Sequence, residues 1–146
     1  MAKHKILLID DESDIRECLC ILVGDTGNYE FDQAGDGAEG LRKILTSDYD
    51  CVVSDIKMPG LDGVSMLKQV RAAGKDVPVV FISAFADEQF DFALTQYGAV
   101  KLIHKLDLKD VAGRVQEAIR VGEDSQAMLR TDPMANDFLS LLNNRK

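Results

Sequence analysis

The sequence predicts an α/β fold, in which a doubly wound, five-stranded parallel sheet carries helices on both faces. Short apolar segments alternate five times along the chain with segments in which apolar residues recur at helical spacing. Three apolar segments are continuous, as in strands buried on both faces, whereas two alternate apolar and charged residues as edge strands do. With right-handed crossovers, these edges give the strand order 2-1-3-4-5, a flavodoxin-like arrangement.

The strands are predicted from apolar content and from the turns that bound them. In chain order they are Lys5–Ile9, Tyr29–Ala34, Cys51–Ser54, Val79–Ser83 and Val100–His104. Glu30, Asp32 and Lys101 place charge on the second and fifth strands, which predicts that these two lie at the edges.

The helices are predicted between and after these strands. Apolar positions recur over 15–22, 38–45, 64–70 and 108–119, and a further helix is predicted around 88–96. Gly24 ends the first helix and Gly98 follows the fourth, while Pro59 and Gly60 mark the loop before the third. Asp107 opens the last helix.

Composition narrows the class of protein. The chain has 146 residues, of which 46% are hydrophobic and 29% charged, as in ordinary globular domains. A net charge of -8 argues against nucleic acid or an anionic membrane as the main partner. No apolar run is long enough for a signal peptide or a membrane span, so we expect a cytoplasmic protein. Cys18, Cys20 and Cys51 are expected to be unpaired packing thiols.

Polar side chains gather where the predicted strands end. Asp10 and Asp11 follow the first strand, and Asp55 follows the third, so three carboxylates converge at the switch point of the sheet. Repulsion among them requires a compensating cation, and oxygen ligands of this kind suit Mg²⁺. Ser83 ends the fourth strand and Lys105 follows the fifth, at the same edge. Nearby acidic residues, such as Glu12, are expected to cap the helix that follows.

These residues resemble the receiver domains of bacterial two-component response regulators. The resemblance lies in Asp10-Asp11, in the run Asp55-Ile56-Lys57-Met58-Pro59-Gly60-Leu61-Asp62-Gly63, in Ser83-Ala84, and in Gly98-Ala99 ahead of Lys105. It covers about the first 120 residues. It implies a stand-alone protein similar to chemotaxis response regulators, which accepts a phosphoryl group and acts as an interaction switch or a relay.

The resemblance also implies a role for each site residue. Asp55 would take the phosphoryl group from a phosphohistidine of a sensor kinase or phosphotransfer protein. Mg²⁺ would be bound by Asp10, Asp11, Asp55 and the backbone carbonyl of Lys57. Ser83 and Lys105 would contact phosphoryl oxygens. The protein would thus be a phosphoacceptor rather than an enzyme, with a downstream protein target, and a monomer or weak dimer.

Two positions depart from the family pattern. Leu102 stands where receivers usually have the aromatic residue that turns inward on phosphorylation, and Leu106 stands where proline usually follows the lysine. A cis bond before a residue other than proline costs about 3–4 kcal/mol, so we predict a trans Lys105–Leu106 bond. In the family, the positions of Lys57 and Phe85 flank the phosphoryl group. We expect the bulk of Phe85 to hinder the attacking water and lengthen the phosphorylated state.

Residues 121–146 are predicted to be a C-terminal extension without an output domain. Asp132-Pro133 resembles a helix start, and Met134, Phe138, Leu141 and Leu142 share one face of a short amphipathic helix over about 133–143. This helix either docks on its own domain or serves dimerisation or partner binding. The sequence leaves both open.

Three other classes of function compete with a phosphoacceptor switch. A phosphatase similar to the haloacid-dehalogenase group needs an aspartate two residues after the nucleophile, where this chain has Lys57. A flavodoxin-like electron carrier would need a phosphate-binding loop after the first strand instead of Asp10-Asp11. A receiver-like interaction module that works without phosphate is the main alternative, and Leu102 and Leu106 favour it.

Overall fold

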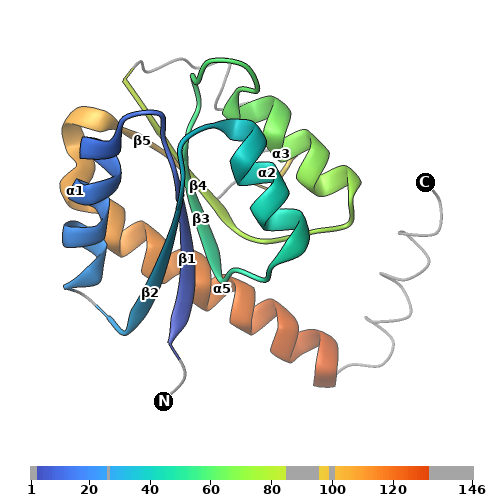
Figure 1. The fold of residues 1–146 in the computed structure, drawn as a ribbon. Helices are drawn as coiled ribbons and strands as arrows, with labels where there is room; N and C mark the ends of the chain where they lie inside the picture. The colour runs from blue at the N-terminus through green and yellow to red at the C-terminus, as the bar shows by residue number, and fades with distance from the viewer. Residues whose placement is uncertain (1–2, 26, 85–95, 99–100, 132–146) are drawn as a thin grey trace.

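The computed structural model contains a parallel sheet of five strands in the order β2-β1-β3-β4-β5, as predicted (Figure 1). The strands are β1 His4–Ile9, β2 Tyr29–Ala34, β3 Cys51–Asp55, β4 Val79–Ser83 and β5 Lys101–His104. The helices are α1 Ser13–Gly24, α2 Gly37–Thr46, α3 Gly63–Ala72, the 3-10 helix η1 Lys105–Asp110 and α5 Val111–Thr131. The structure describes residues 3–25, 27–84, 96–98 and 101–131, so the helix predicted around 88–96 lies almost wholly outside the described residues.

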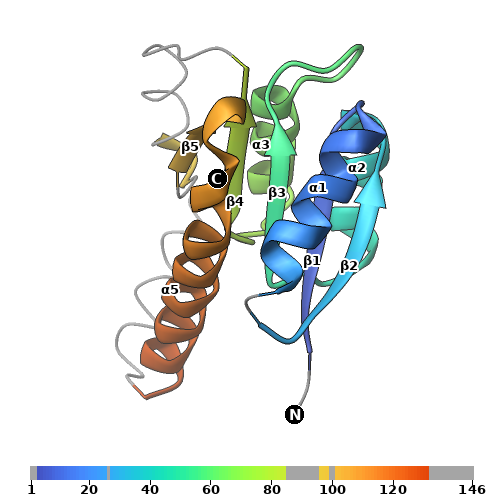
Figure 2. The same ribbon diagram turned by 90° about the vertical axis from the view of Figure 1, so that its left-hand side faces the viewer.

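The helices form two layers around the sheet. Helices α1 and α5 cover one face, and α2 and α3 cover the other (Figures 1 and 2). Successive residues of β1 face opposite sides of the sheet. Leu7 and Ile9 pack toward α2 and α3. Ile6 and Leu8 pack toward α1 and α5. The sheet therefore has a hydrophobic core on each face.

Burial distinguishes the central strands from the edge strand β2. Every residue of β3 and β4 is buried, whereas in β2 only the last residue, Ala34, is buried. This matches the continuous apolar runs and the alternating run read from the sequence. Cys51 lies in the buried set, and burial raises the pKa of its thiol to about 12, which suits packing rather than reactivity.

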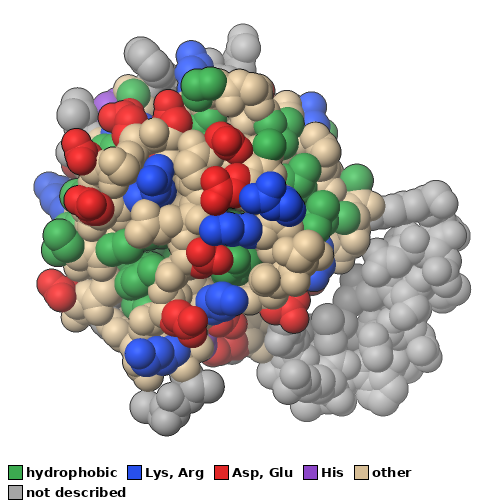
Figure 3. Space-filling view, viewed as in Figure 1, with side chains coloured by type: hydrophobic (Ala, Val, Ile, Leu, Met, Phe, Trp, Pro, Cys, Tyr) green, Lys and Arg blue, Asp and Glu red, His purple; other side chains and the backbone are tan. Residues whose placement is uncertain are grey.

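Charged residues tie α2 to the edge strand. Lys43 Nζ lies 3.1 Å from Asp32 Oδ1 and 3.4 Å from Glu39 Oε1. Tyr49 donates a hydrogen bond of 2.7 Å to Asp32 Oδ2, and that bond, together with Lys43, lowers the pKa of Asp32. Figure 3 shows acidic and basic side chains interspersed on this face of the molecule.

The strand register brings the carboxyl ends of the strands level. Ile9 of β1 pairs with Ser54 of β3, Asp55 with Ile82 of β4, and Ser83 with His104 of β5. Residues just after β1 and β5 therefore lie at the same edge as the last residues of β3 and β4.

Helix α5 is longer than the sequence predicts. It continues through the expected boundary at residue 120 to Thr131, and the helix predicted over 133–143 lies outside the described residues. In Figures 1 and 2 its last turns project beyond the amino-terminal ends of β3 and β4. Among the described residues, no helix has the length and apolar character needed to cross a membrane.

Candidate functional site

Three carboxylates meet at the carboxyl edge of the sheet. One oxygen from each of Asp10, Asp11 and Asp55 lies within 4.8 Å of the others. Asp10 is fully buried and Asp55 is nearly so, whereas Asp11 is exposed. The cluster thus has a buried base and an open side, as a site for a small ligand requires.

Lys105 supplies the positive charge within this cluster. Its Nζ lies 3.1 Å from Asp55 Oδ2, 3.2 Å from Asp10 Oδ2 and 3.3 Å from Glu12 Oε1. Burial alone would lower the pKa of Lys105, but the hydrogen bond to Asp55 and the charge of Asp10 outweigh burial and raise it. The ammonium group therefore stays charged while it links β1 to β3.

Burial dominates the acid–base behaviour of the two inner carboxylates. It raises the pKa of Asp10 to about 6, against the lowering effects of the Glu12 amide and of Lys105. It also raises the pKa of Asp55, although Lys105 opposes that rise. Lys105 therefore lowers the pKa of both carboxyl groups without cancelling the effect of burial.

The two carboxylate oxygens of Asp10 differ in their hydrogen bonding. Oδ1 accepts a hydrogen bond of 2.9 Å from the backbone amide of Glu12. Oδ2 is within ion-pair distance of Lys105, but no donor in the described part of the chain is oriented to hydrogen-bond it. A buried carboxylate oxygen in this state favours a further cation. The donor set of carboxylates therefore fits a divalent metal ion such as Mg²⁺.

The loop after β3 holds Asp55 in place. Ile56 and Met58 are buried, and the Gly63 amide donates a hydrogen bond of 2.7 Å to the Ile56 carbonyl. A Cβ atom at Gly63 would lie 2.4 Å from the Asp55 carbonyl oxygen, so only glycine permits this approach. Asp62 caps α3 by accepting a hydrogen bond of 2.7 Å from the Ser65 amide.

Ser83 and Lys57 belong to the two neighbouring strand ends of β3 and β4, at the edge of the sheet that carries the acidic cluster. Ser83 ends β4 and is 3% exposed. Lys57 follows Asp55 by two residues in the loop, and its side chain is exposed.

The positions that depart from the family pattern are only partly described. Leu102 pairs with Phe81 in the sheet, and Leu106 lies in η1, but the side chains of both lie outside the described residues, as does the whole of Phe85. The described chain has no cis peptide bond, so the Lys105–Leu106 bond is trans, as predicted.

The side chain of Glu12 does not cap α1, contrary to the prediction from the sequence. Glu12 occupies the N-cap position of α1, but its side chain makes no capping hydrogen bond and contacts Lys105 instead. The reason is electrostatic, because the Lys105 ammonium attracts the carboxylate more strongly than a neutral backbone amide does. No sequence pattern distinguishes the two roles.

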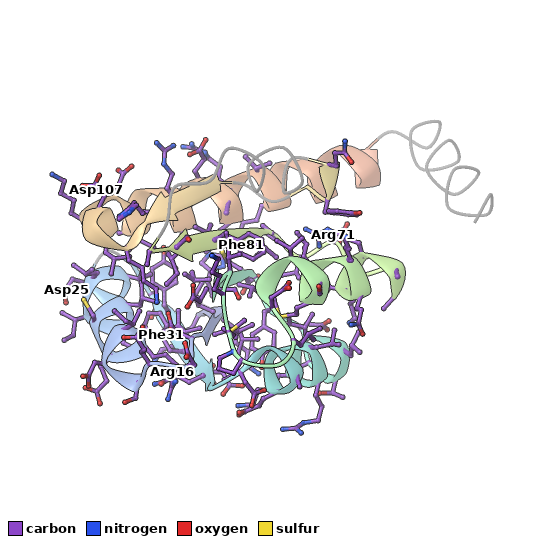
Figure 4. All side chains as sticks on the ribbon, turned by 90° about the horizontal axis from the view of Figure 1, so that it is seen from above. Arg16, Asp25, Phe31, Arg71, Phe81 and Asp107 are labelled. Atoms are coloured by element: carbon purple, nitrogen blue, oxygen red, sulfur yellow. The ribbon has the colours of Figure 1, made fainter. Side chains whose placement is uncertain are left out.

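Arg16 contacts the site, although it was not among the residues predicted from the sequence. From α1 it donates a hydrogen bond through Nη1 to the backbone carbonyl of Asp10 and another of 2.9 Å through Nε to Gln33 Oε1. Figure 4, viewed toward the carboxyl edge of the sheet, shows Arg16 on the α1 side and Phe81 near β4 and α3. Arg16 thus fixes the backbone of a site residue, although it lies six positions further along the chain.

A match to known families agrees with this geometry. The response regulator receiver domain family matches residues 6–116. The chain belongs to this family.

Several curated relatives are similar over part of their length. The transcriptional regulatory protein PrrA of Mycobacterium leprae is 36% identical over 121 residues, which are 82% of this chain and 52% of PrrA. The response regulator ArlR of Staphylococcus saprophyticus is 29% identical over 133 residues, or 90% of this chain and 55% of ArlR. This chain spans about half the length of these two relatives. The prediction that nucleic acid is not a partner gains no support, because relatives are named transcriptional regulators.

Solved structures of receiver domains have the same fold. The receiver domain of the Francisella response regulator 1452 is 27% identical with a TM-score of 0.75, covering 82% of this chain and 99% of that one. TrrA of Thermotoga maritima, solved in complex with Mg²⁺ and BeF, is 30% identical with a TM-score of 0.70, covering 79% and 98%.

Proposed function

We propose that this receiver domain accepts a phosphoryl group on Asp55 from a phosphohistidine of a sensor kinase or phosphotransfer protein, in a Mg²⁺-dependent reaction. The observation that carries the proposal is the position of Asp55, 3.1 Å from Lys105 and in one cluster with Asp10 and Asp11. Family membership supports the same assignment. The domain would act as a phosphoacceptor rather than as an enzyme with turnover on a separate substrate.

The reaction needs a nucleophile and neutralised charge. A carboxylate oxygen of Asp55 would attack phosphorus while the phosphorus–nitrogen bond to the donor imidazole breaks. The electron pair of that bond stays on the imidazole nitrogen, which takes up a proton from water, so that the donor leaves as a neutral imidazole. Asp55 needs no general base, because a carboxylate is already ionised at neutral pH. Lys105 would exchange its contact with Asp55 for a phosphoryl oxygen, and Ser83 would donate a hydrogen bond to another.

A divalent cation would fit beside these groups. Asp10, Asp11 and Asp55 would hold it, with the Lys57 carbonyl as a further oxygen ligand. When bound, Mg²⁺ supplies positive charge that neutralises the phosphoryl oxygens during transfer. The buried Asp10 oxygen that lacks an oriented donor supports this use of the site.

Phosphorylation would change the affinity of the domain for a downstream protein. A phosphorylated aspartate adds nearly two negative charges at the edge where Lys105 already joins β5 to β1 and β3. Such a charge shifts a two-state equilibrium only through contacts that differ between the states, and the contact of Lys105 with Asp55 would be one of them.

Intact-mass spectrometry after incubation with acetyl phosphate tests the proposal. Wild-type protein should gain one phosphoryl mass with Mg²⁺ and none with excess chelator. Asp55→Asn should gain none, whereas Asp25→Asn, a matched change at the exposed end of α1, should behave as wild type. Absence of an adduct at every time from seconds onward, under conditions that label another receiver, would refute the proposal.

A receiver-like module that binds its partner without phosphate is the second candidate. It is favoured by Leu102, which stands where the family usually has an aromatic residue. In that case Asp55→Asn would leave partner binding unchanged, whereas the phosphate-dependent switch requires a change.

A further inference from the structure

A cavity opens at the end of the sheet opposite the acidic cluster. It has a volume of about 660 Å³ and is formed by the connection from α2 to β3, the connection from α3 to β4 and the middle of α5. Because strands β3 and β4 begin here and end at Asp55 and Ser83, the cavity is separated from the phosphoacceptor site by the length of the sheet. The phosphoacceptor chemistry therefore makes no use of it.

One side of the cavity is apolar. Val77 and Pro78 line it where the chain enters β4, and Ile119 and Val121 line it from α5. Val121 is 52% exposed, which is unusual for a branched apolar side chain beside a concave surface. This side would lose water contact if another apolar segment covered it.

The charged residues of the lining are mainly acidic. Asp48, Asp50, Asp76 and Glu123 contribute carboxylates, and the basic residue among the lining residues is Lys75. Lys75 already lies 3.4 Å from Asp48, and His4 lies 3.6 Å from both Asp50 and Glu123. The cavity therefore suits a segment that is apolar along one face and carries positive charge at its end.

The end of this chain has that composition. Met134, Phe138, Leu141 and Leu142 fall on one face of the predicted helix over 133–143. Arg145 and Lys146 follow it. We infer that residues 132–146 fold back along α5 and dock in this cavity, so that the apolar face covers Val121 and the basic end approaches Glu123 and the neighbouring aspartates.

Chain length agrees with this arrangement. Thr131 ends the described part of α5 eight residues after Glu123, which is about 12 Å along a helix axis. An antiparallel helix over 133–143 would span roughly 16 Å, so Leu141 and Leu142 would come back to the level of Glu123. A reversal between antiparallel helices takes about two to five residues, so the end of α5 at Thr131 would open to join the helix start at Asp132-Pro133. A turn this short gives docking within one chain a high effective concentration over docking of a second copy.

Hydrogen exchange measured by mass spectrometry on the full chain tests the inference. The double variant Leu141→Ser/Leu142→Ser removes apolar contact, and Asn143→Ser, on the opposite face of the predicted helix, is the control. We expect amides of residues 47–50 and 75–77 to exchange at least about fivefold faster in the double variant and at the wild-type rate in the control. Residues 8–12 should be unaffected in both. Equal exchange in the double variant and wild type would overturn the inference.

A charge exchange provides a second, independent arm. Glu123→Lys should increase exchange at residues 75–77, and Arg145→Glu/Lys146→Glu should restore protection in that background. Failure of the rescue would contradict docking of the basic end. The protection should also be independent of protein concentration, because the segment and cavity belong to one chain. Protection that grows with concentration, together with a dimer in sedimentation, would replace this inference with docking of a second copy.

Discussion

Lys105 Nζ lies 3.1 Å from Asp55 Oδ2 and is held against the same edge of the sheet by Asp10. One ammonium group thus bridges the strand that ends in the proposed phosphoacceptor and the strand that precedes the proposed metal ligands. Any group that binds at this edge must either share Lys105 with Asp55 or displace it.

Replacing Lys105 should strengthen Mg²⁺ binding. In Lys105→Met the three carboxylates lose the cation that competes with the metal. Removing a repulsion of about 1 kcal/mol should raise the affinity for Mg²⁺ roughly fivefold in isothermal titration calorimetry at neutral pH. Lys109→Met, at an exposed position of η1, removes the same charge as a control. Weaker Mg²⁺ binding by a folded Lys105→Met protein would mean that Lys105 does not compete for the cluster.

The stability of the metal-free protein should depend on Asp10. The pKa of about 6 in the folded protein exceeds the ordinary value of 3.8, so the folded state binds this proton more tightly than the unfolded chain does. The contribution of Asp10 is therefore most favourable below about pH 4 and is lost as the pH rises through 6. Asp10→Asn should raise the free energy of unfolding at pH 7 by roughly 1–2 kcal/mol without Mg²⁺, and by nothing measurable below pH 4.

Urea unfolding followed by circular dichroism at the two pH values checks this prediction, with and without Mg²⁺. Mg²⁺ should stabilise wild type more than Asp10→Asn, because the variant loses a metal ligand. A variant less stable than wild type at pH 7 in chelator would show that the buried Asp10 charge is fully compensated by Lys105.

A methyl group at Gly63 should disrupt the loop that carries Asp55. In Gly63→Ala the new Cβ would lie 2.4 Å from the Asp55 carbonyl oxygen and 2.7 Å from Phe81 Cε1. We expect a loss of about 1–3 kcal/mol in the free energy of unfolding. Gly113→Ala is the matched control in α5, where no atom lies within 4 Å of the new Cβ, and it should stabilise by about 0.5–1 kcal/mol. Equal effects of the two substitutions in urea unfolding would exclude the close approach.

Arg16 should act on metal affinity through the backbone of Asp10. Arg16→Met removes the hydrogen bonds to the Asp10 carbonyl and to Gln33, so the metal-binding turn loses its fixed position. We expect roughly threefold to tenfold weaker Mg²⁺ binding by calorimetry, the cost of about one net hydrogen bond. Arg42→Met, exposed on α2, should bind Mg²⁺ as wild type does. Unchanged Mg²⁺ affinity in Arg16→Met would mean that Arg16 contributes to the packing of α1 and not to metal binding.

Much of the fold could be predicted because its signals are local. The buried strands β3 and β4 are continuous apolar runs, and the charged residues Glu30 and Asp32 mark β2 as an edge. Parallel strands must bring Asp10, Asp55, Ser83 and Lys105 to one edge, so their proximity follows from the order of elements. The extension of α5 to Thr131 was not predicted, because the polar residues after Ile119 interrupt the apolar pattern.

The details of the site depend on contacts that a sequence does not encode locally. Glu12 was expected to cap α1, but its choice of Lys105 depends on a residue 93 positions away in the chain. Arg16 reaches Asp10 and Gln33 because α1 packs on the face of the sheet over the adjacent strands β1 and β2. The positions of Glu12 and Arg16 in the sequence do not distinguish these two residues from ordinary surface residues of a helix.

The most direct test of the account is to locate the phosphoryl group. After reaction with acetyl phosphate and Mg²⁺, borohydride converts a phosphorylated aspartate to homoserine, which tandem mass spectrometry of the digested chain identifies by position. We predict homoserine at position 55 alone, and none when chelator replaces Mg²⁺. Homoserine at position 10 or 11, or its absence at 55 in protein whose intact mass shows the adduct, would contradict the assignment of Asp55 as the phosphoacceptor.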